Sequence, residues 1–332
     1  MDINVTTKQK NYIVHIEKGI LDRLSCFLKP DRYYYVVSEN GVPKLWQDKV
    51  LSQLKNAKLF LFEQGEANKN INTYLKIQEW LIENNASRKD VLIALGGGVT
   101  GDLGGFVASS YKRGITFINI PTTLLSQVDA SVGGKTAIDV NGIKNIIGAF
   151  YQPEAVFIDP EVLSTLSPRQ LSNGMAEAIK MGLICDEKLF EVFETQESHE
   201  HLEEIICRSI KAKTKVVEAD ENENGLRKIL NFGHTLGHAY ETASKGKYLH
   251  GECVAMGMMQ ILENKEIKKR LEKVLRKEML PISYDGDNEE LYALILNDKK
   301  GNHDHIDVVL LDEIGKPRIE TIGINKLKEV LK

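Results

Sequence analysis

The chain has 332 residues, of which 42% are hydrophobic and 27% charged, a composition that suits a globular protein with room for two domains. Its formal net charge of -4 argues against general binding to nucleic acid or to a membrane surface. The four cysteines are scattered without a CxxC spacing, which excludes a disulfide framework and a cysteine-rich zinc site.

The first half of the chain alternates short apolar runs with helix-like segments. It opens without a basic leader or an apolar run of about 18 residues, so we expect no signal peptide, no membrane span and a cytoplasmic location. The opening "INVTTKQKNYIVHIEKG" predicts a strand pair, and the runs at 32–38, 57–63, 90–95 and 115–120 predict buried strands. Helical spacing in "VPKLWQDKVLSQL" and "NINTYLKIQEWLIENN" then indicates βαβ units and a mainly parallel sheet.

The character of the chain changes after "AVFIDP", where helical periods take over. In "SPRQLSNGMAEAIKMGLI", Ser167 suits an N-cap and Pro168 the first helical position. Three further stretches have a helical period: "EEIICRSIKAKTKVVEAD", "LNFGHTLGHAYETA" and "CVAMGMMQILENKEIKKRLEKVLRKEM". The charged run 263–278 is interpreted as a solvated helix face, and "IDVVLLDEIGKPRIETI" as a short hairpin. We therefore predict an α/β domain over residues 1–154 and a mostly helical domain over residues 155–332.

A glycine-rich turn, Gly96-Gly97-Gly98, follows the third strand of the series and precedes a helix. Glycine at such a turn lets a phosphate approach the backbone, and the helix N-terminus favours its negative charge. The acidic residue that a standard dinucleotide-binding fingerprint carries about 20 residues later is missing. Dinucleotide binding in a non-standard form is one interpretation, and a tight turn with glycines for packing is the other.

A second stretch, 121–153, combines glycines with an unusual density of polar side chains. The polar residues in and just before it are Lys112, Arg113, Thr122, Thr123, Asp129, Lys135, Lys144 and Asn145. Lysines and threonines near flexible glycines suit a phosphate, although each lysine alone would more often be a surface residue. The "GGKT" in this stretch lacks the spacing of a P-loop, which excludes an ATP-hydrolysis site of that kind.

Three histidines form the strongest candidate for a metal site. His234 and His238 are four residues apart in a helix-like stretch, so they share one face, and His250 follows a loop. A catalytic zinc commonly takes two histidines and one carboxylate and leaves a position open. The spacing also fits one ligand beside one acid–base residue, or histidines that are simply buried or exposed. Four acidic residues compete for the carboxylate position: Glu177, Glu241, Glu252 and Asp220.

Further polar residues lie near this candidate in the sequence. Arg227 and Asn231, four residues apart, are expected to share the face of His234, and Lys180 lies three residues beyond Glu177. With Lys213 they would suit a phosphorylated, polyhydroxylated substrate. For His303 and His305 in "HDH" a solvated loop is favoured over a metal site.

Seven stretches together resemble the 3-dehydroquinate synthase family of sugar phosphate cyclases, in order and from about Glu66 to Lys300: "GGGVTGDLGGFVASSYKRGI", "IPTTLLSQVDASVGGKTAID", "KNIIGAFYQP", "GMAEAIKMG", "LNFGHTLGHA", "LHGECVAMG" and "DKK". The resemblance implies an α/β NAD-binding domain followed by a helical metal- and substrate-binding domain. It also implies a cytoplasmic homodimer with NAD and one divalent metal, zinc or cobalt. The substrate would be a phosphorylated sugar acid, 3-deoxy-D-arabino-heptulosonate 7-phosphate, which the family converts into 3-dehydroquinate and phosphate in the shikimate pathway of aromatic amino-acid biosynthesis.

The resemblance also assigns roles to individual positions. The metal ligands would be Glu177, His234 and His250, with His238 at the substrate instead of the metal. The remaining substrate and catalytic positions would be Arg113, Lys135, Asn145, Lys180, Lys213, Arg227, Asn231 and Lys299 or Lys300, with Arg113 acting across the dimer interface. The NAD site would use Glu66, Lys69, Gly97, Gly98, Asp102, Thr122, Thr123, Asp129, Lys135 and Lys144.

Two features depart from the family pattern. An early nucleotide-binding turn often carries aspartate in a "TDxN"-like segment, where this chain has "VSENG", and the stretch between "CVAMGMM" and "DKK" is shorter than usual.

The implied reaction oxidises a substrate alcohol with NAD, eliminates phosphate, returns the hydride and closes the ring by an aldol step. The alternatives are a cyclase that makes 2-deoxy-scyllo-inosose or a valiolone-type product, a metal-dependent polyol dehydrogenase, and a non-catalytic NAD-binding or metal-storage protein.

Overall fold

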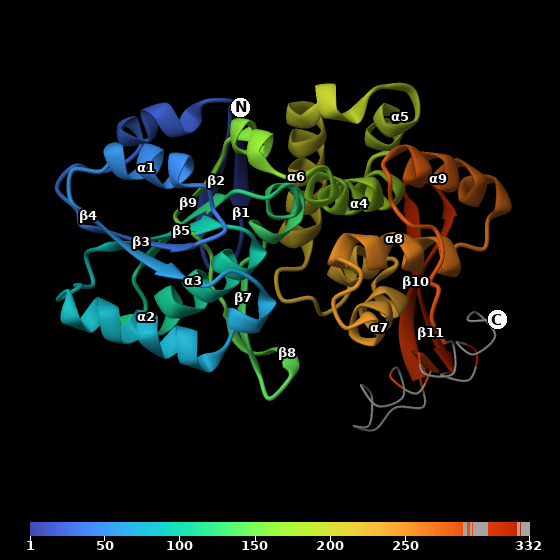
Figure 1. Cartoon of the computed structure of the whole chain (residues 1–332). Coiled ribbons are helices and arrows are strands. Elements are labelled where there is room, and N and C mark those ends of the chain that lie inside the picture. Colours follow the sequence, from blue (N-terminus) through green and yellow to red (C-terminus); the bar gives the residue numbers. More distant parts are fainter. Residues whose placement is uncertain (288–290, 293, 295–304, 324–325, 327–332) are drawn as a thin grey trace. The chain divides into compact units, whose positions relative to one another are not determined.

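The chain divides into two compact units, seen in a computed structural model that describes residues 1–287, 291, 292, 294, 305–323 and 326 (Figure 1). The first unit comprises Met1–Ser167 and Lys213–Asn222, and the second comprises Pro168–Ala212 and Glu223–Lys332. The functions assigned above to residues 1–154 and 155–332 stay predictions.

The first unit is built on a seven-stranded sheet. Its strands, in spatial order, are β1 (Asp2–Thr6), β2 (Asn11–Ile16), β9 (Ala155–Ile158), β6 (Thr116–Pro121), β5 (Val91–Gly96), β3 (Tyr34–Glu39) and β4 (Ala57–Phe62). Strands β1 and β2 pair antiparallel, and all other neighbours in the sheet are parallel. The predicted strand pair and the mainly parallel sheet are both confirmed.

Helices cover both faces of this sheet, with α1 (Lys44–Ser52) on one side and α2 (Ile71–Glu83) and α3 (Gly98–Ser110) on the other (Figure 1). Alternate strand residues such as Tyr35, Val37 and Leu92 belong to a buried apolar cluster with residues of α2 and α3. The intervening strand residues, among them Val36 and Ile93, are fully buried as well. Burial on both faces explains why the strands are continuous apolar runs instead of alternating ones.

The order of the strands places a ligand-binding position at one edge of this sheet. Strand β3 leads through α1 to β4 on one side, whereas β5 leads through α3 to β6 on the other side. The carboxyl ends of β3 and β5 are therefore adjacent at the point where the strand order reverses, and ligands of open α/β sheets bind at such a point. The glycine-rich turn lies here, because β5 ends at Gly96 and α3 begins at Gly98.

A separate antiparallel hairpin, β7 (Lys135–Val140) and β8 (Ile143–Phe150), lies beside α3 in the same unit. The residue pattern does not predict this hairpin, because the stretch is rich in glycine and polar residues. The missed signal is the pair Asn141-Gly142, which connects the strands with positive φ values of 51° and 78°. Asn-Gly is the preferred pair for a two-residue hairpin turn of this kind.

The second unit is mostly helical, as predicted. Its helices are α4 (Pro168–Cys185), α5 (Glu187–Thr195), α6 (Leu202–Ala219, of which the part from Lys213 belongs to the first unit), α7 (His234–Ser244), α8 (His250–Ile261) and α9 (Lys265–Lys277). Strands β10 (His305–Glu313) and β11 (Lys316–Gly323) form the predicted late hairpin. Within the described residues, every helix is too short or too polar to cross a bilayer.

Two stretches expected to be continuous helices are interrupted. Arg227 and Asn231 lie in a short 3₁₀ segment, Leu226–Asn231, and α7 begins only after Gly233, whose φ of 78° is left-handed. The expectation that these two residues share a helix face with His234 is therefore wrong. The long stretch after Cys253 is likewise two helices, because Asn264 accepts hydrogen bonds from the first backbone N–H groups of α9 and starts a new helix there.

Candidate active site

Three side chains from three helices of the second unit converge on one point. Glu177 comes from the middle of α4, and His234 and His250 are the first residues of α7 and α8. The Nε2 atoms of both imidazoles lie 3.4 Å from Glu177 Oε1. Potential ligand atoms of the three residues all lie within 4.8 Å of one another, and Glu177 is only 1% exposed.

The start of α8 is fixed against α4, which brings His250 to Glu177. The Gly251 backbone N–H donates to Asn173 Oδ1 at 2.7 Å, one helical turn before Glu177. A Cβ at Gly251 would lie 2.0 Å from the Asn173 carbonyl oxygen, so no other residue permits this approach. Arg169 of α4 also makes a bidentate ion pair with Glu252 of α8, in which Nε and Nη2 each donate to the carboxylate at 2.7 Å.

The start of α7 is fixed against α8 in a comparable way. Gly233 turns the chain out of the 3₁₀ segment with a left-handed φ of 78°, and His234 follows at once. A Cβ at Gly233 would lie 2.6 Å from Met258 Cγ and 2.8 Å from the Val254 carbonyl oxygen. The close contact of the two helices therefore depends on this glycine.

The hydrogen bonds of the two imidazoles leave their Nε2 atoms facing the carboxylate. His250 Nδ1 lies 3.1 Å from Glu241 Oε2, and His234 Nδ1 lies 3.2 Å from the Phe232 carbonyl oxygen. Both partners are acceptors, so each Nδ1 carries a proton, and Nε2 is the nitrogen of each ring that a metal would bind in place of a proton. This is the arrangement in which histidine binds a metal.

Charge around Glu177 keeps this carboxylate ionised. Burial alone would raise its pKa, but the neighbouring Lys180 ammonium and His234 outweigh burial and hold the pKa of Glu177 well below its usual range. Burial and Lys180 lower the pKa of His234. Burial also acts to lower the pKa of His250, yet Glu177 and Glu241 overcome it and raise this pKa to about 9.

These residues fit a divalent metal by the chemistry of the donor set. Both carboxylate oxygens of Glu177 are buried without a well-aligned hydrogen-bond donor among the described residues. Two imidazole nitrogens and one carboxylate are the protein ligands of many catalytic zinc sites. Of the competing carboxylates, Glu252 accepts hydrogen bonds from Arg169 and from the Leu249 backbone N–H instead.

His238 lies beside this cluster without being one of its three members. Its ring centre is 5.3 Å from that of His234 and 6.0 Å from that of His250, and its side chain is exposed. With Glu241 and His250 it forms a second, overlapping group of possible ligands. Nearby in the sequence, Arg227 is 2% exposed, and the Asn231 amide donates to Glu223 Oε1 at 3.1 Å.

In the first unit, a buried lysine lies among three acidic residues, two of which, Glu66 and Asp102, the family resemblance assigns to NAD. Lys69 Nζ lies 3.0 Å from Asp102, 3.3 Å from Glu66 and 4.0 Å from Asp139. Lys144 Nζ lies 4.0 Å from Glu66 Oε1, the same oxygen that Lys69 Nζ approaches. Burial raises the pKa of Asp102 to about 6, although Lys69 acts in the opposite direction.

The carboxyl ends of β3, β5 and β6 bring together the glycine-rich turn, the two threonines and an acid that sequence reasoning did not select. The Gly97 N–H and the Thr100 hydroxyl donate to Glu39 Oε1 at 3.3 and 3.2 Å. The Thr122 N–H donates to the Gly96 carbonyl at 2.9 Å, and Thr123 follows it. Glu39 could have been found as the acid that ends a buried strand, but only knowledge of the strand order makes that strand a neighbour of the glycine turn.

Comparison with known proteins identifies the family. The model "3-dehydroquinate synthase N-terminal" matches residues 59–173, and "3-dehydroquinate synthase C-terminal" matches residues 174–301. The chain belongs to the 3-dehydroquinate synthase family.

Members of the 3-dehydroquinate synthase family and a solved cyclase are similar over nearly all or all of the chain. The 3-dehydroquinate synthase of Streptococcus thermophilus (strain CNRZ 1066) is 42% identical over 353 residues, which cover 100% of this chain and 99% of that protein. That of Clostridium tetani (strain Massachusetts / E88) is 42% identical over 321 residues, covering 92% and 86%. A crystal structure of 2-deoxy-scyllo-inosose synthase with carbaglucose-6-phosphate, NAD+ and Co2+ has a TM-score of 0.91 at 28% identity and covers 100% and 99%. The predicted family and its two-part fold are confirmed.

The other positions matched to the 3-dehydroquinate synthase family lie in the first unit or outside the described residues. Lys213 Nζ donates to Asp129 Oδ1 at 2.8 Å and to its carbonyl oxygen at 2.7 Å. Lys135 begins β7 and Asn145 lies in β8, while Arg113 is exposed with a φ of 68°. The residues outside the described part are Lys299, Lys300 and His303, whereas His305 begins β10.

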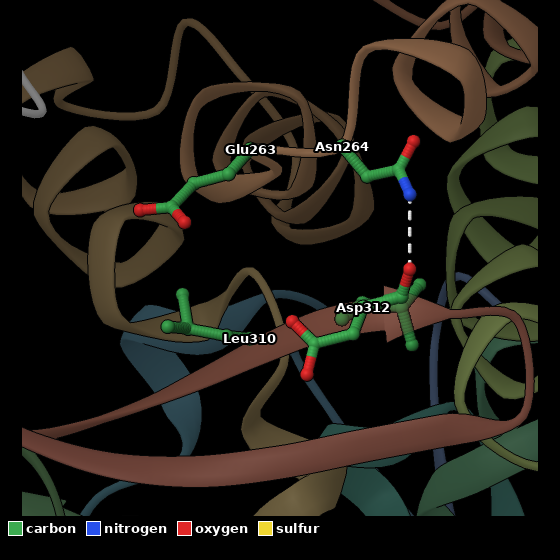
Figure 2. Close-up of a pocket in the computed structure, with 5 residues that line it drawn as sticks. Glu263, Asn264, Leu310 and Asp312 are labelled. Carbon is green, nitrogen blue, oxygen red and sulfur yellow. Dashed lines mark hydrogen bonds between the residues drawn. The ribbon is translucent and has the colours of Figure 1, made fainter.

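A surface pocket lies elsewhere in the second unit, between β10 and the residues that precede α9 (Figure 2). Its lining consists of Glu263, Asn264, Leu310, Leu311 and Asp312, and the Asn264 amide donates to the Asp312 carbonyl at 2.9 Å. None of these residues matches a family position, so we assign the pocket no role in the reaction.

Proposed function

We propose that this chain is a 3-dehydroquinate synthase of the shikimate pathway, an NAD- and metal-dependent phosphate lyase and cyclase. It would convert 3-deoxy-D-arabino-heptulosonate 7-phosphate into 3-dehydroquinate and phosphate. The observation that carries the proposal is the Glu177, His234 and His250 cluster beside the buried Lys180, in a chain of this family. The 42% identity to a 3-dehydroquinate synthase, against 28% to 2-deoxy-scyllo-inosose synthase, favours dehydroquinate over another cyclised product.

Glu177, His234 and His250 would hold a zinc or cobalt ion. A divalent ion bound there would polarise a substrate hydroxyl and lower its pKa. The protein's own part is to keep the donors ready, since Lys180 holds Glu177 ionised and the Nδ1 hydrogen bonds fix both imidazoles. These three ligands leave coordination positions for the substrate.

The NAD site would lie in the first unit, around the glycine-rich turn. The N-terminus of α3 at Gly97 and Gly98 would face the pyrophosphate, with Thr122 and Thr123 at the adjacent strand end. Glu39 ends the strand at the point where the strand order reverses, and we propose that it accepts from the adenosine ribose in place of the family's aspartate. The other NAD positions are Glu66, Lys69, Asp102, Asp129, Lys135 and Lys144. NAD would take a hydride from the substrate and return it within each turnover.

The remaining residues would bind the phosphorylated substrate and stabilise the negative charge of the departing phosphate. Cationic side chains stabilise a departing phosphate, which is the role we assign to Arg113, Lys135, Lys180, Lys213, Arg227 and one of Lys299 and Lys300. Asn145 and Asn231 would donate to substrate oxygens. His238 would exchange protons at the substrate, since it adjoins the metal cluster and has an exposed ring.

Assembly and location belong to the same proposal. We propose a cytoplasmic homodimer in which Arg113 serves the partner's substrate, because this arginine is exposed on a strained turn. Residues 1–154 would form the NAD-binding domain and residues 155–332 the metal- and substrate-binding domain.

Two measurements on the purified protein, supplied with NAD and zinc, separate the proposal from its alternatives. With 3-deoxy-D-arabino-heptulosonate 7-phosphate we expect phosphate release at many turnovers and no stoichiometric accumulation of NADH. A polyol dehydrogenase would instead accumulate NADH, and a cyclase that makes 2-deoxy-scyllo-inosose would release no phosphate from this substrate. Either of these outcomes would overturn the proposed activity.

A further inference from the structure

The β7–β8 hairpin contains an irregularity at Asp139. Ile138 pairs with Ile147 and Val140 pairs with Ile143, so the register shifts between the two pairs. Three residues of β8, 144–146, therefore lie opposite the single residue Asp139. A bulge of this kind bends a strand and redirects its side chains, and bulges are frequent next to active sites.

The side chain of Asp139 replaces the ladder bond that the bulge removes. Its Oδ1 atom accepts from the Asn145 backbone N–H at 2.8 Å. Asn145 has a φ of 55°, a left-handed conformation that needs support from its surroundings. The bulge thus depends on one carboxylate.

The same residue joins the hairpin to the lysine cluster. The Asp139 backbone N–H donates to the Lys69 carbonyl at 2.8 Å, and Asp139 pairs with Asn70 as a parallel bridge. Its Oδ1 atom also lies 4.0 Å from Lys69 Nζ, whose other acidic neighbours are Asp102 and Glu66. One side chain therefore contacts both the Lys69 cluster and the bulge that carries Lys144 and Asn145.

We propose that Asp139 is a positioning residue that holds the β8 bulge, with Lys144 and Asn145, in register with Lys69. It contacts neither reactant in this account, yet binding of the substrate by Asn145 would depend on it. The inference rests on the proposed function, in which Lys69 and Lys144 bind NAD and Asn145 binds the substrate.

Three variants separate positioning from general stability. Asp139→Ala removes the acceptor and the charge, whereas Asp139→Asn keeps an oxygen that can accept from the Asn145 N–H. Thr136→Val is the matched control, because it removes another side-chain hydrogen bond of the same hairpin, from Thr136 Oγ1 to the Ala149 carbonyl at 2.8 Å, without touching Asn145. Melting temperatures of all three establish that the chain is folded.

The kinetic readout is the split between KM and kcat. For Asp139→Ala we expect KM for the sugar phosphate to rise about tenfold, the size of one lost charge-assisted hydrogen bond, with a smaller change in kcat. In Asp139→Asn, KM should lie within about twofold of the wild-type value, and we expect the same for Thr136→Val. An Asp139→Asn variant as impaired as Asp139→Ala, or an equal rise in KM for Thr136→Val, would overturn the proposal.

A second readout does not depend on the activity. Amide hydrogen exchange at Asn145 should quicken about tenfold in Asp139→Ala and stay near the wild-type rate in the other two variants. Unchanged exchange in Asp139→Ala would overturn the positioning role even if the enzyme is active. If wild-type protein releases no phosphate while exchange follows this pattern, the proposed function fails and the structural role of Asp139 stands.

Discussion

Two clusters, one in each unit, place a buried lysine beside carboxylates, and they differ in the role that we propose for them. In the first unit, Lys69 lies among Asp102, Glu66 and Asp139, and Asp139 also accepts a backbone N–H. In the second unit, Lys180 pairs with Glu177, whose carboxylate also faces the Nε2 atoms of two histidines. In the first cluster the carboxylates face a lysine and a backbone N–H of the protein, whereas the second gathers a carboxylate and two imidazoles, the donor set of many metal sites.

The pKa shifts in the two clusters run in opposite directions for the same physical reasons. Burial favours the neutral form of both carboxyls. At Asp102 burial prevails because one lysine is shared among several acids, and the pKa rises to about 6. At Glu177 the lysine and the imidazoles prevail, and the pKa falls well below its usual range. A carboxylate that stays ionised while buried is the one suited to bind a metal.

The largest expected effect is the loss of metal from Glu177→Gln. The amide removes the only negative charge of the three proposed ligands, so we expect metal affinity to fall by more than about 100-fold, beyond the effect of changing an outer residue. Elemental analysis after gel filtration measures this. Glu278→Gln is the matched control, since Glu278 is also a buried acid of the second unit and its carboxylate accepts a hydrogen bond from the Ser198 hydroxyl, away from the metal cluster. Unchanged metal content in Glu177→Gln would contradict the ligand assignment.

Glu241→Gln tests the outer part of the same cluster. The Glu241 carboxylate accepts from His250 Nδ1 at 3.1 Å and so orients the imidazole. Replacing such a partner typically costs about 10–100-fold in metal affinity, and we expect a loss in this range. Competition with a chromophoric zinc chelator gives the affinity. Wild-type affinity in this variant would mean that His250 is held by other contacts.

Lys135→Ala tests a proposed substrate-binding residue of the first unit. We expect substrate KM to rise about tenfold or more and turnover to fall, because a phosphate-binding cation is lost. NAD affinity, measured by protein fluorescence, should fall much less, because Lys135 is one of several residues proposed around the cofactor. A variant that lost only NAD affinity would leave Lys135 to the cofactor site alone.

The smallest expected effect is a pH dependence of stability from Asp102. Its pKa is raised in the folded state, so this carboxyl contributes stability at low pH that is lost as pH rises from 3.8 through about 6. The free energy of unfolding of wild-type protein, relative to Asp102→Asn, should therefore fall between these pH values. Urea denaturation at several pH values measures it. A difference that is constant or rises with pH would contradict the raised pKa.

The sheet and most helices could be predicted because their signals are local. Buried strands carry uninterrupted apolar runs, and the helical stretches keep their period. The helical period continues across Gly233 and so gives no sign of the break there. The β7–β8 hairpin is marked by Asn141-Gly142, but this pair lies in a stretch whose lysines and glycines are not typical of strands. Local patterns therefore could not distinguish a continuous helix from a broken one at Gly233, or a loop from a hairpin at 135–150.

The candidate site needed tertiary information. Spacing left Glu177, Glu241, Glu252 and Asp220 open as the carboxylate, and only the packing of α4 against α8 brings Glu177 to His250. Glu39 and Asp139 escaped notice for the same reason, because their partners, Gly97 and Asn145, are fixed by strand order and by a bulge. The resemblance to a known family supplied what spacing could not.

The most direct test of the account is phosphate release from 3-deoxy-D-arabino-heptulosonate 7-phosphate by the purified protein with catalytic NAD. We expect many turnovers with zinc or cobalt, arrest by a chelator, and recovery when the metal is restored. Phosphate release that continues unchanged after the metal has been removed would contradict the central role of the Glu177, His234 and His250 cluster.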